Sequence, residues 1–154
     1  MNYRRLGKSN LQVSEVSLGC MSLDPKIEDH SSLLNKAIDS GINYFDTADF
    51  YDKGINESII GKSLGSRRKE VILATKVGNV WDNNGKTWHW NPSKKYILSA
   101  VDNSLKRLKT DFIDLYQLHG GTIKDPIDEP SRLLKYWLIQ VRYVIMASHL
   151  SGLM

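Results

Sequence analysis

Three apolar runs in the chain each end on a polar residue that can hold or exchange a proton. These residues are Asp46, Lys76 and His119, and a phenol, Tyr51, follows Asp46 by five positions. Short apolar runs bounded by turn residues are typical of buried strands. Where such strands are parallel and adjacent, their carboxyl ends meet at one edge of the sheet, where α/β folds place their active sites. We therefore expect these four side chains to gather at that edge.

The elements that must position these residues alternate along the chain. We expect a hairpin over residues 3–14, strands over 16–19, 44–45, 71–76 and 112–119, and helices over 31–40, 56–64 and 92–108. Asn56 and Asn91 are the expected N-caps of the second and third helices. Four strand–helix alternations with short connections predict a parallel α/β fold with right-handed crossovers. Eight such units, a TIM-type (β/α)8 barrel, need roughly 250 residues, and this sequence has 154.

A longer connection separates the third strand from the third helix. It runs from residue 77 to residue 91 and contains Trp81, Trp88 and Trp90 among polar residues and glycines. Connections of this length usually serve a site or are mobile. The three tryptophans therefore either wall a substrate pocket or pack against the body of the domain.

Composition places the chain among soluble globular proteins, with 41% hydrophobic and 25% charged residues. The net charge of +4 comes from scattered basic residues without a recognisable reader motif, which argues against nucleic-acid binding. Cys20 is the single cysteine, so an internal disulfide is excluded. The first residues lack the apolar stretch of a signal peptide, and we expect a cytoplasmic protein. His30, His89 and His149 lack ligand-like spacing, and we expect no metal.

Three motifs resemble the aldo-keto reductases in order and in spacing. They are Gly41-Ile-Asn-Tyr-Phe-Asp-Thr-Ala-Asp-Phe-Tyr51, Leu73-Ala-Thr-Lys76 and Asp111-Phe-Ile-Asp-Leu-Tyr-Gln-Leu-His119, the last preceded by Arg107-Leu-Lys-Thr. The resemblance runs from the hairpin to about Glu129. It implies the amino-terminal half of a (β/α)8 barrel that reduces aldehydes and ketones with NADPH, so small carbonyl compounds are the expected substrates.

The resemblance also implies roles for the four polar residues, which would form the catalytic tetrad. Hydride delivered to a carbonyl carbon leaves charge on the oxygen, which must be protonated as it develops. Tyr51 would be the acid, because a neighbouring ammonium such as Lys76 favours ionisation of a phenol. Asp46 would pair with Lys76, and His119 would orient the substrate oxygen.

Further site residues follow from the same resemblance. Gly19, Cys20 and Met21, at the end of the first strand, would lie against the nicotinamide together with Asp46. Trp81, Trp88 and Trp90 would wall the substrate side. Each residue taken alone also has an ordinary structural interpretation, such as a turn cap for Asp46 or a solvated strand end for Lys76.

The family-like pattern stops beyond Glu129. We divide the chain into a half-barrel over residues 1–129 and an aberrant tail over residues 130–154. When the codons are regrouped by one base, residues 144–154 permit Tyr-Tyr-Gly-Ile-Ser-Ser-Ile-Arg-Pro-Asn and residues 129–135 permit Thr-Ile-Glu-Ala-Phe-Glu, both of which resemble family sequence. We therefore expect a frameshift near codons 129 to 130 and a premature stop after Met154.

The tail itself has apolar residues at helical spacing. Leu133, Leu134, Trp137, Leu138, Val141, Val144, Ile145 and Leu150 predict an amphipathic helix from about Arg132 to His149. A membrane span is the alternative, but Gln140, Arg142 and His149 interrupt the apolar run.

Three functions remain open at this stage. The chain is an NADPH-dependent reductase, a truncated form of one that is inactive, or a nucleotide-binding regulatory subunit of the same fold. An inactive half-barrel would expose strand edges and an apolar inner face, which favours self-association.

Overall fold

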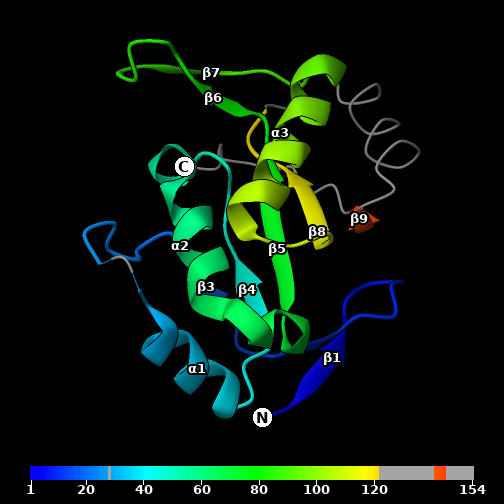
Figure 1. The fold of residues 1–154 in the computed structure, drawn as a ribbon. Coiled ribbons are helices and arrows are strands. Elements are labelled where there is room, and N and C mark those ends of the chain that lie inside the picture. Colours follow the sequence, from blue (N-terminus) through cyan, green and yellow to red (C-terminus); the bar gives the residue numbers. More distant parts are fainter. Residues whose placement is uncertain (28, 122–140, 145–154) are drawn as a thin grey trace, which may run out of the picture.

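The computed structural model describes residues 1–27, 29–121 and 141–144. The chain begins with the predicted hairpin, in which β1 (Tyr3–Arg5) pairs with β2 (Gln12–Ser14) in antiparallel register. Tyr3 anchors it to the domain by donating its hydroxyl to the Gly41 carbonyl at 2.9 Å. The hairpin lies at the end of the molecule opposite β6 and β7, as Figure 1 shows for β1 at the bottom and β6 and β7 at the top.

A five-stranded parallel sheet forms the centre of the domain. In spatial order it contains β3 (Leu18–Gly19), β4 (Tyr44–Asp46), β5 (Ile72–Val77), β8 (Ile113–Leu118) and β9 (Val141–Val144). Spatial order equals chain order, as in one arc of a (β/α)8 barrel. The fold class predicted from the sequence is therefore confirmed.

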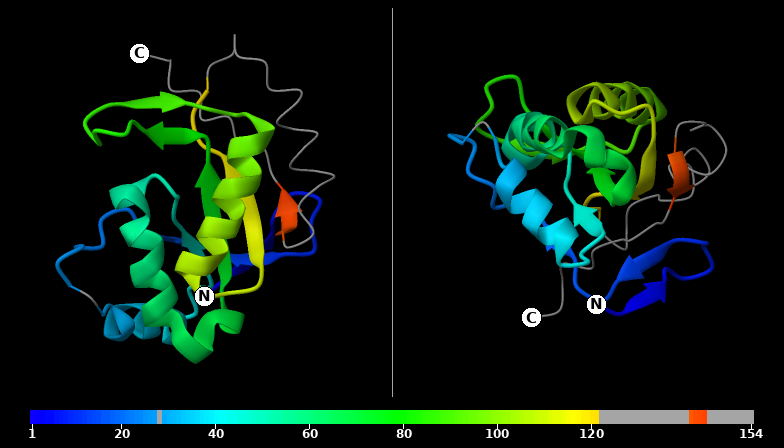
Figure 2. Two further views of the ribbon diagram at one scale, coloured as in Figure 1. Left: turned by 45° about the horizontal axis from the view of Figure 1, so that its top comes forward. Right: turned by 60° about the horizontal axis from the view of Figure 1, so that its bottom comes forward.

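Three helices cover one face of this sheet: α1 (Ser31–Asp39), α2 (Ile55–Leu64) and α3 (Lys94–Leu108). Two 3-10 turns, η1 (Tyr51–Gly54) and η2 (Gly65–Glu70), flank α2. Figures 1 and 2 show α2 and α3 side by side over β4, β5 and β8. The core lies between these layers and includes Phe45, Ile60, Leu73 and Ile97, which are almost inaccessible to solvent.

Both predicted helix caps are wrong. α2 begins at Ile55 after Gly54, and Asn56 is buried inside the helix, where its side chain bonds other elements. α3 has Ser93 rather than Asn91 as its N-cap, with the Ser93 hydroxyl accepting from the Tyr96 N–H. In both segments a small polar residue near the helix start suggested a cap, but tertiary contacts decided which residue ends the turn.

The long connection between β5 and α3 contains a second hairpin that was not predicted from the sequence. Within residues 77–91, β6 (Asn79–Trp81) pairs in antiparallel register with β7 (Trp88–Trp90). Gly85 adopts a positive φ of 63° in the turn. Trp81 lies opposite Trp88 in this ladder, and aromatic pairs of this kind stabilise antiparallel strands.

The predicted tail helix is wrong where the structure describes the tail. Val141–Val144 forms β9, which lies parallel to β8 with Ile113 opposite Val141. Valine and tyrosine favour strands, and the unpaired edge of β8 offers a ladder that a helix could not use. The rest of that helix and the boundary at residue 129 lie outside the described residues. Within the described part of the chain, no helix is long and apolar enough to cross a bilayer.

Candidate active site

The sheet brings the four predicted residues to one edge. Asp46 ends β4, Lys76 is the penultimate residue of β5, His119 follows β8, and Tyr51 opens η1 just after β4. The main chain continues this alignment beyond the strands, because the His119 N–H donates to the Val77 carbonyl at 2.7 Å. The carboxyl ends of three adjacent strands thus present these residues together, as the sequence predicted.

The Lys76 ammonium is the centre of the cluster. It forms an ion pair with the Asp46 carboxylate, donates to the Thr47 carbonyl at 2.9 Å, and lies 3.5 Å from the Tyr51 hydroxyl. The Lys76 side chain is 17% exposed and that of Asp46 is 27% exposed. The pair is therefore sheltered but reachable, and its cation lies beside the Tyr51 phenol.

His119 completes the cluster through its contact with Tyr51. The two rings meet edge to face, with centroids 5.6 Å apart and an interplanar angle of 89°. A phenol and an imidazole placed in this way can both approach one oxygen atom of a substrate, which is the geometry that protonation of a carbonyl requires.

The backbone after Tyr51 takes an unusual course. Asp52, Lys53 and Gly54 are successive residues with positive φ, at 48°, 56° and 88°. A left-handed conformation costs a non-glycine residue about 1–2 kcal/mol. Gly54 leaves no room for a side chain, because an added Cβ would lie 2.8 Å from the Arg107 side chain. The turn reverses the chain so that Tyr51 stays at the sheet edge while α2 starts behind it.

A buried ion pair connects α2 and α3 next to the strand that carries Lys76. Glu57 of α2 is fully buried, accepts from the Thr75 hydroxyl at 2.6 Å and pairs with Arg107 of α3 at 2.6 Å. Thr75 adjoins Lys76 on β5, so this pair fixes both helices to the strand that carries Lys76. Sequence reasoning missed it, although a glutamate at a core-facing position of an otherwise apolar helix was the available signal.

A second buried chain of hydrogen bonds joins β3, β4 and α2. The Thr47 hydroxyl donates to Asn56 Oδ1 at 2.7 Å, and the Asn56 amide donates to the Cys20 carbonyl at 2.7 Å. The Cys20 N–H donates to the Asp46 carbonyl at 2.8 Å. These bonds hold the strand end that carries Asp46, and satisfied buried networks of this kind specify one arrangement.

The aromatic side chains divide into two groups. Trp81 stacks on Phe50 with centroids 4.5 Å apart, and Trp88 meets Phe50 edge to face at 5.7 Å. Phe50 also contacts the His119 ring at 5.9 Å, so Trp81 and Trp88 adjoin the cluster. Trp90 instead packs against the backbone of Gly78 and Gly121. Phe50 was not predicted from the sequence, although it immediately precedes Tyr51.

The predicted cofactor-facing residues differ in accessibility. Met21 is 61% exposed, and Gly19 has no atom within 4 Å of an added Cβ. Both therefore leave open surface beside Asp46, which pairs in register with Gly19. Cys20 is fully buried, and burial raises the pKa of its thiol to about 12. Only the backbone of Cys20 can therefore face a ligand at this edge, whereas Gly19, Met21 and Asp46 remain accessible.

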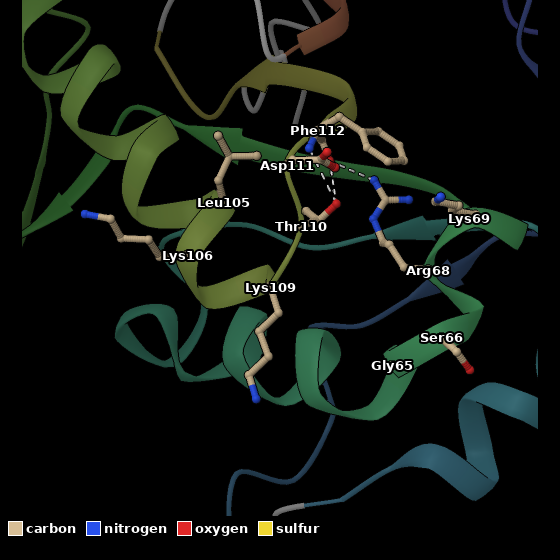
Figure 3. A pocket seen from close by; sticks show the side chains of 10 residues that line it. All are labelled: Gly65, Ser66, Arg68, Lys69, Leu105, Lys106, Lys109, Thr110, Asp111 and Phe112. Atoms are coloured by element: carbon tan, nitrogen blue, oxygen red, sulfur yellow. Dashed lines mark hydrogen bonds between the residues drawn. The ribbon is translucent and has the colours of Figure 1, made fainter.

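One cavity lies away from these residues. A cavity of about 630 Å³ opens at the opposite end of β5 and β8, between η2 and the end of α3. Figure 3 shows Lys106 and Lys109 pointing away from Arg68 and Phe112, so its basic residues do not converge on a common point. No tetrad residue lines this cavity. Among the described residues, no group of three histidine, cysteine, aspartate or glutamate side chains could hold a metal ion.

Comparisons with known proteins point to one family. A family model described as the aldo/keto reductase family matches residues 15–137. The "Uncharacterized oxidoreductase YqkF" of Bacillus subtilis (strain 168) is 59% identical over 129 residues, covering 84% of this chain and 42% of the relative. The holo form of aldo-keto reductase AKR11C1 from Bacillus halodurans matches with a TM-score of 0.88 and 48% identity, over 97% of this chain and 51% of that one.

A relative with a different printed role also matches. The "Probable voltage-gated potassium channel subunit beta" of Arabidopsis thaliana is 35% identical over 144 residues, covering 88% of this chain and 42% of the relative. The chain spans about half the length of the relatives it matches.

Proposed function

Because the chain belongs to the aldo/keto reductase family, an oxidoreductase family, we propose that the barrel to which this half corresponds reduces aldehydes and ketones with NADPH, and that Tyr51 is the acid. One observation supports this most directly. The Lys76 ammonium contacts both the Asp46 carboxylate and, at 3.5 Å, the Tyr51 hydroxyl.

The roles of the four residues follow from their contacts. A nicotinamide cofactor, when bound, supplies the hydride. Tyr51 gives its proton to the carbonyl oxygen as negative charge develops there, and Lys76 stabilises the phenolate that remains. Asp46 compensates the charge of Lys76 in a sheltered site. His119 donates a hydrogen bond to the same oxygen and fixes its direction, as its ring beside Tyr51 allows.

The surroundings support both ligands. Gly19, Met21 and Asp46 border the edge where the nicotinamide ring would lie, and the backbone of Cys20 completes that border. Trp81 and Trp88, with Phe50 between them, provide an apolar wall for a small carbonyl compound. Trp90 would contribute to this wall only indirectly, because its ring packs on Gly78, the residue after β5. The free, buried cysteine is consistent with a reducing cytoplasm.

The test uses a hybrid barrel. Residues 1–121 of this chain are joined to the carboxyl-terminal half of AKR11C1, whose matching half is 48% identical. We expect NADPH-dependent aldehyde reduction, and we expect Tyr51→Phe to lower turnover by about 10²-fold or more while leaving NADPH affinity nearly unchanged. Tyr3→Phe, which alters an exposed hairpin tyrosine, is the matched control. Turnover of Tyr51→Phe within about twofold of the parent would exclude Tyr51 as the acid.

A second experiment uses the 154-residue chain by itself. We expect them to show no NADPH-dependent turnover and to self-associate, because strand edges and the inner sheet face lack their partners in the barrel. Saturable NADPH binding at micromolar concentration with aldehyde-dependent oxidation would contradict this expectation.

The similarity to a potassium channel β subunit favours one alternative. In that alternative the fold binds a nucleotide and serves as a regulatory subunit. A hybrid barrel that binds NADPH but oxidises it with none of a panel of aldehydes and ketones would support the alternative over the reductase.

A further inference from the structure

Asp49 joins three elements around the site. It lies between Asp46 and Tyr51, and its N–H donates to the Lys76 carbonyl at 3.2 Å. Its carboxylate oxygen Oδ2 accepts from the hydroxyl of Tyr96, in the first turn of α3, at 2.9 Å. The segment that carries Tyr51 is thereby tied to β5 through the main chain and to α3 through a side chain.

The surroundings of this carboxyl are charged and almost closed to solvent. Asp49 Oδ1 is inaccessible and has no hydrogen-bond partner among the described residues. Burial raises the pKa of Asp49 to about 7, although the hydrogen bond from Tyr96 lowers it. The charge of Glu57 on α2 raises the pKa further, and the charge of Arg107 on α3 lowers it.

One more phenol faces the same cluster. Tyr116 of β8 is buried, and its hydroxyl has no partner among the described residues. Burial first, and then the charge of Asp49, raises the pKa of Tyr116. Asp49 is therefore hydrogen-bonded to Tyr96 and interacts through its charge with Glu57, Arg107 and Tyr116. These residues belong to α2, α3 and β8.

We propose that Asp49 is a positioning residue, which clamps the loop from Thr47 to Tyr51 between α3 and β5 and so holds the Tyr51 hydroxyl beside the Lys76 ammonium. The distance of 3.5 Å between Lys76 Nζ and the Tyr51 hydroxyl is at the outer limit of a hydrogen bond. A small displacement of the loop therefore breaks this contact. The proposal rests on the function proposed above, in which Tyr51 is the acid.

Ionisation of Asp49 changes the clamp. The anion accepts a stronger hydrogen bond from Tyr96 than the neutral acid does, since bonds to charged groups are shorter and stronger. It also adds negative charge close to Glu57, which Arg107 already neutralises. The position of Tyr51 consequently responds to the protonation of Asp49 through the loop that joins the two residues.

The test follows Tyr51 itself in the full 154-residue chain labelled with ¹³C-tyrosine. Tyr51→Phe assigns its signal, which is recorded from pH 5 to about 9 without cofactor or substrate. We expect an inflection near pH 7 that Asp49→Asn abolishes. Tyr96→Phe keeps the ring but removes the bond that favours the charged carboxylate, so the inflection moves up by about one pH unit. The Tyr44 signal serves as an internal reference.

Other outcomes overturn the proposal. The His119 ring also contacts Tyr51, so an inflection that survives Asp49→Asn and disappears in His119→Gln belongs to the imidazole. An inflection that Tyr96→Phe leaves in place, or tyrosine signals without dispersion in the parent chain, also contradicts the clamp. This measurement needs no turnover. An inactive hybrid barrel would therefore contradict the proposed function without changing the result on the position of Tyr51.

Discussion

The two ends of the parallel sheet each hold an ion pair, and the pairs differ in what surrounds them. At the carboxyl end, Lys76 and Asp46 are 17% and 27% exposed, and the cation also lies beside the Tyr51 hydroxyl. At the amino end, Arg68 and Asp114 are 9% and 4% exposed and pair at 2.8 Å.

The second pair is enclosed by the backbone. Arg68 donates to the carbonyls of Val71 and Phe112 at 3.1 and 3.0 Å, and Asp114 accepts from the Leu73 N–H at 3.0 Å. Its hydrogen bonds therefore fix chain segments to one another. An ion pair that solvent can reach and that contacts a titratable group can take part in chemistry, whereas an enclosed pair stabilises the fold. In (β/α)8 barrels the carboxyl-terminal face carries the active site and the amino-terminal face contributes stability.

Removing the cation of the reachable pair gives the largest expected effect. In the hybrid barrel, Lys76→Met should lower turnover by about 10²-fold or more, because Tyr51 loses the charge that stabilises its phenolate. The free energy of unfolding should change by only about 1 kcal/mol, since the site is partly exposed. Steady-state kinetics and urea unfolding of the same sample provide the two measurements. A loss of stability with unchanged turnover would reverse the roles assigned to the two pairs.

Removing the cation of the enclosed pair should do the opposite. Arg68→Met leaves Asp114 buried without its charge partner, which costs about 3–5 kcal/mol of folding free energy. Turnover per folded hybrid molecule should stay within about twofold of the parent. Arg67→Met, which removes ion pairs with the exposed carboxylates of Asp39 and Glu70, is the control and should cost about 1 kcal/mol. If both arginine variants unfolded equally easily, the enclosed pair would have no special structural role.

The pH dependence of stability sharpens the comparison through Asp49. Its pKa is about 7 in the folded chain and near the ordinary value of 3.8 when unfolded, so between these values the folded state binds more protons. The contribution of Asp49 to the free energy of unfolding is therefore highest below about pH 4. It falls as the pH rises to about 7 and then levels off. The loss amounts to at most roughly 4 kcal/mol.

Asp49→Asn should remove this slope. Urea unfolding of the full chain at about pH 5 and pH 8 measures it, and the variant should be the more stable of the two chains at the higher pH. A wild-type chain that gains stability over this range would show that Asp49 is ionised at lower pH than its burial implies.

A small gain of stability is expected from a substitution near the amino end of the sheet, where α3 ends. Lys109 ends α3 with a positive φ of 51°, which glycine adopts without strain. Lys109→Gly should therefore raise the free energy of unfolding by about 0.5–1 kcal/mol and leave turnover of the hybrid unchanged. Thermal unfolding compared with Lys106→Gly, a substitution inside the helix that should be destabilising, gives the control.

The strands β3, β4, β5 and β8 and the four candidate residues could be predicted because their signals are local. Each of Asp46, Lys76 and His119 follows an apolar run, and the parallel register then aligns the strand ends. The helices were likewise visible from apolar spacing, as the buried residues Ile97, Val101 and Leu108 of α3 confirm.

The supporting network could not be predicted because its partners are far apart in sequence. Glu57 and Arg107 are 50 residues apart, and Asp49 and Tyr96 are 47 apart. Nothing in either local pattern selects the partner, since the pairing depends on how α2 and α3 cross the sheet. β9 was missed for a similar reason, because only the free edge of β8 makes a strand preferable there.

Agreement between spatial order and chain order in the sheet has a consequence for how the protein is made. Within the described strands, β3 pairs with β4, β4 with β5 and β5 with β8, so each new strand meets a neighbour that the ribosome has already released. Domains form from the amino terminus during synthesis at about 5–20 residues per second. Contacts between consecutive units also involve short loops, which favours fast folding. We therefore expect α2 to dock on β4 and β5 while β8 is still in the exit tunnel, so that Asp46, Tyr51 and Lys76 meet before His119 leaves the ribosome.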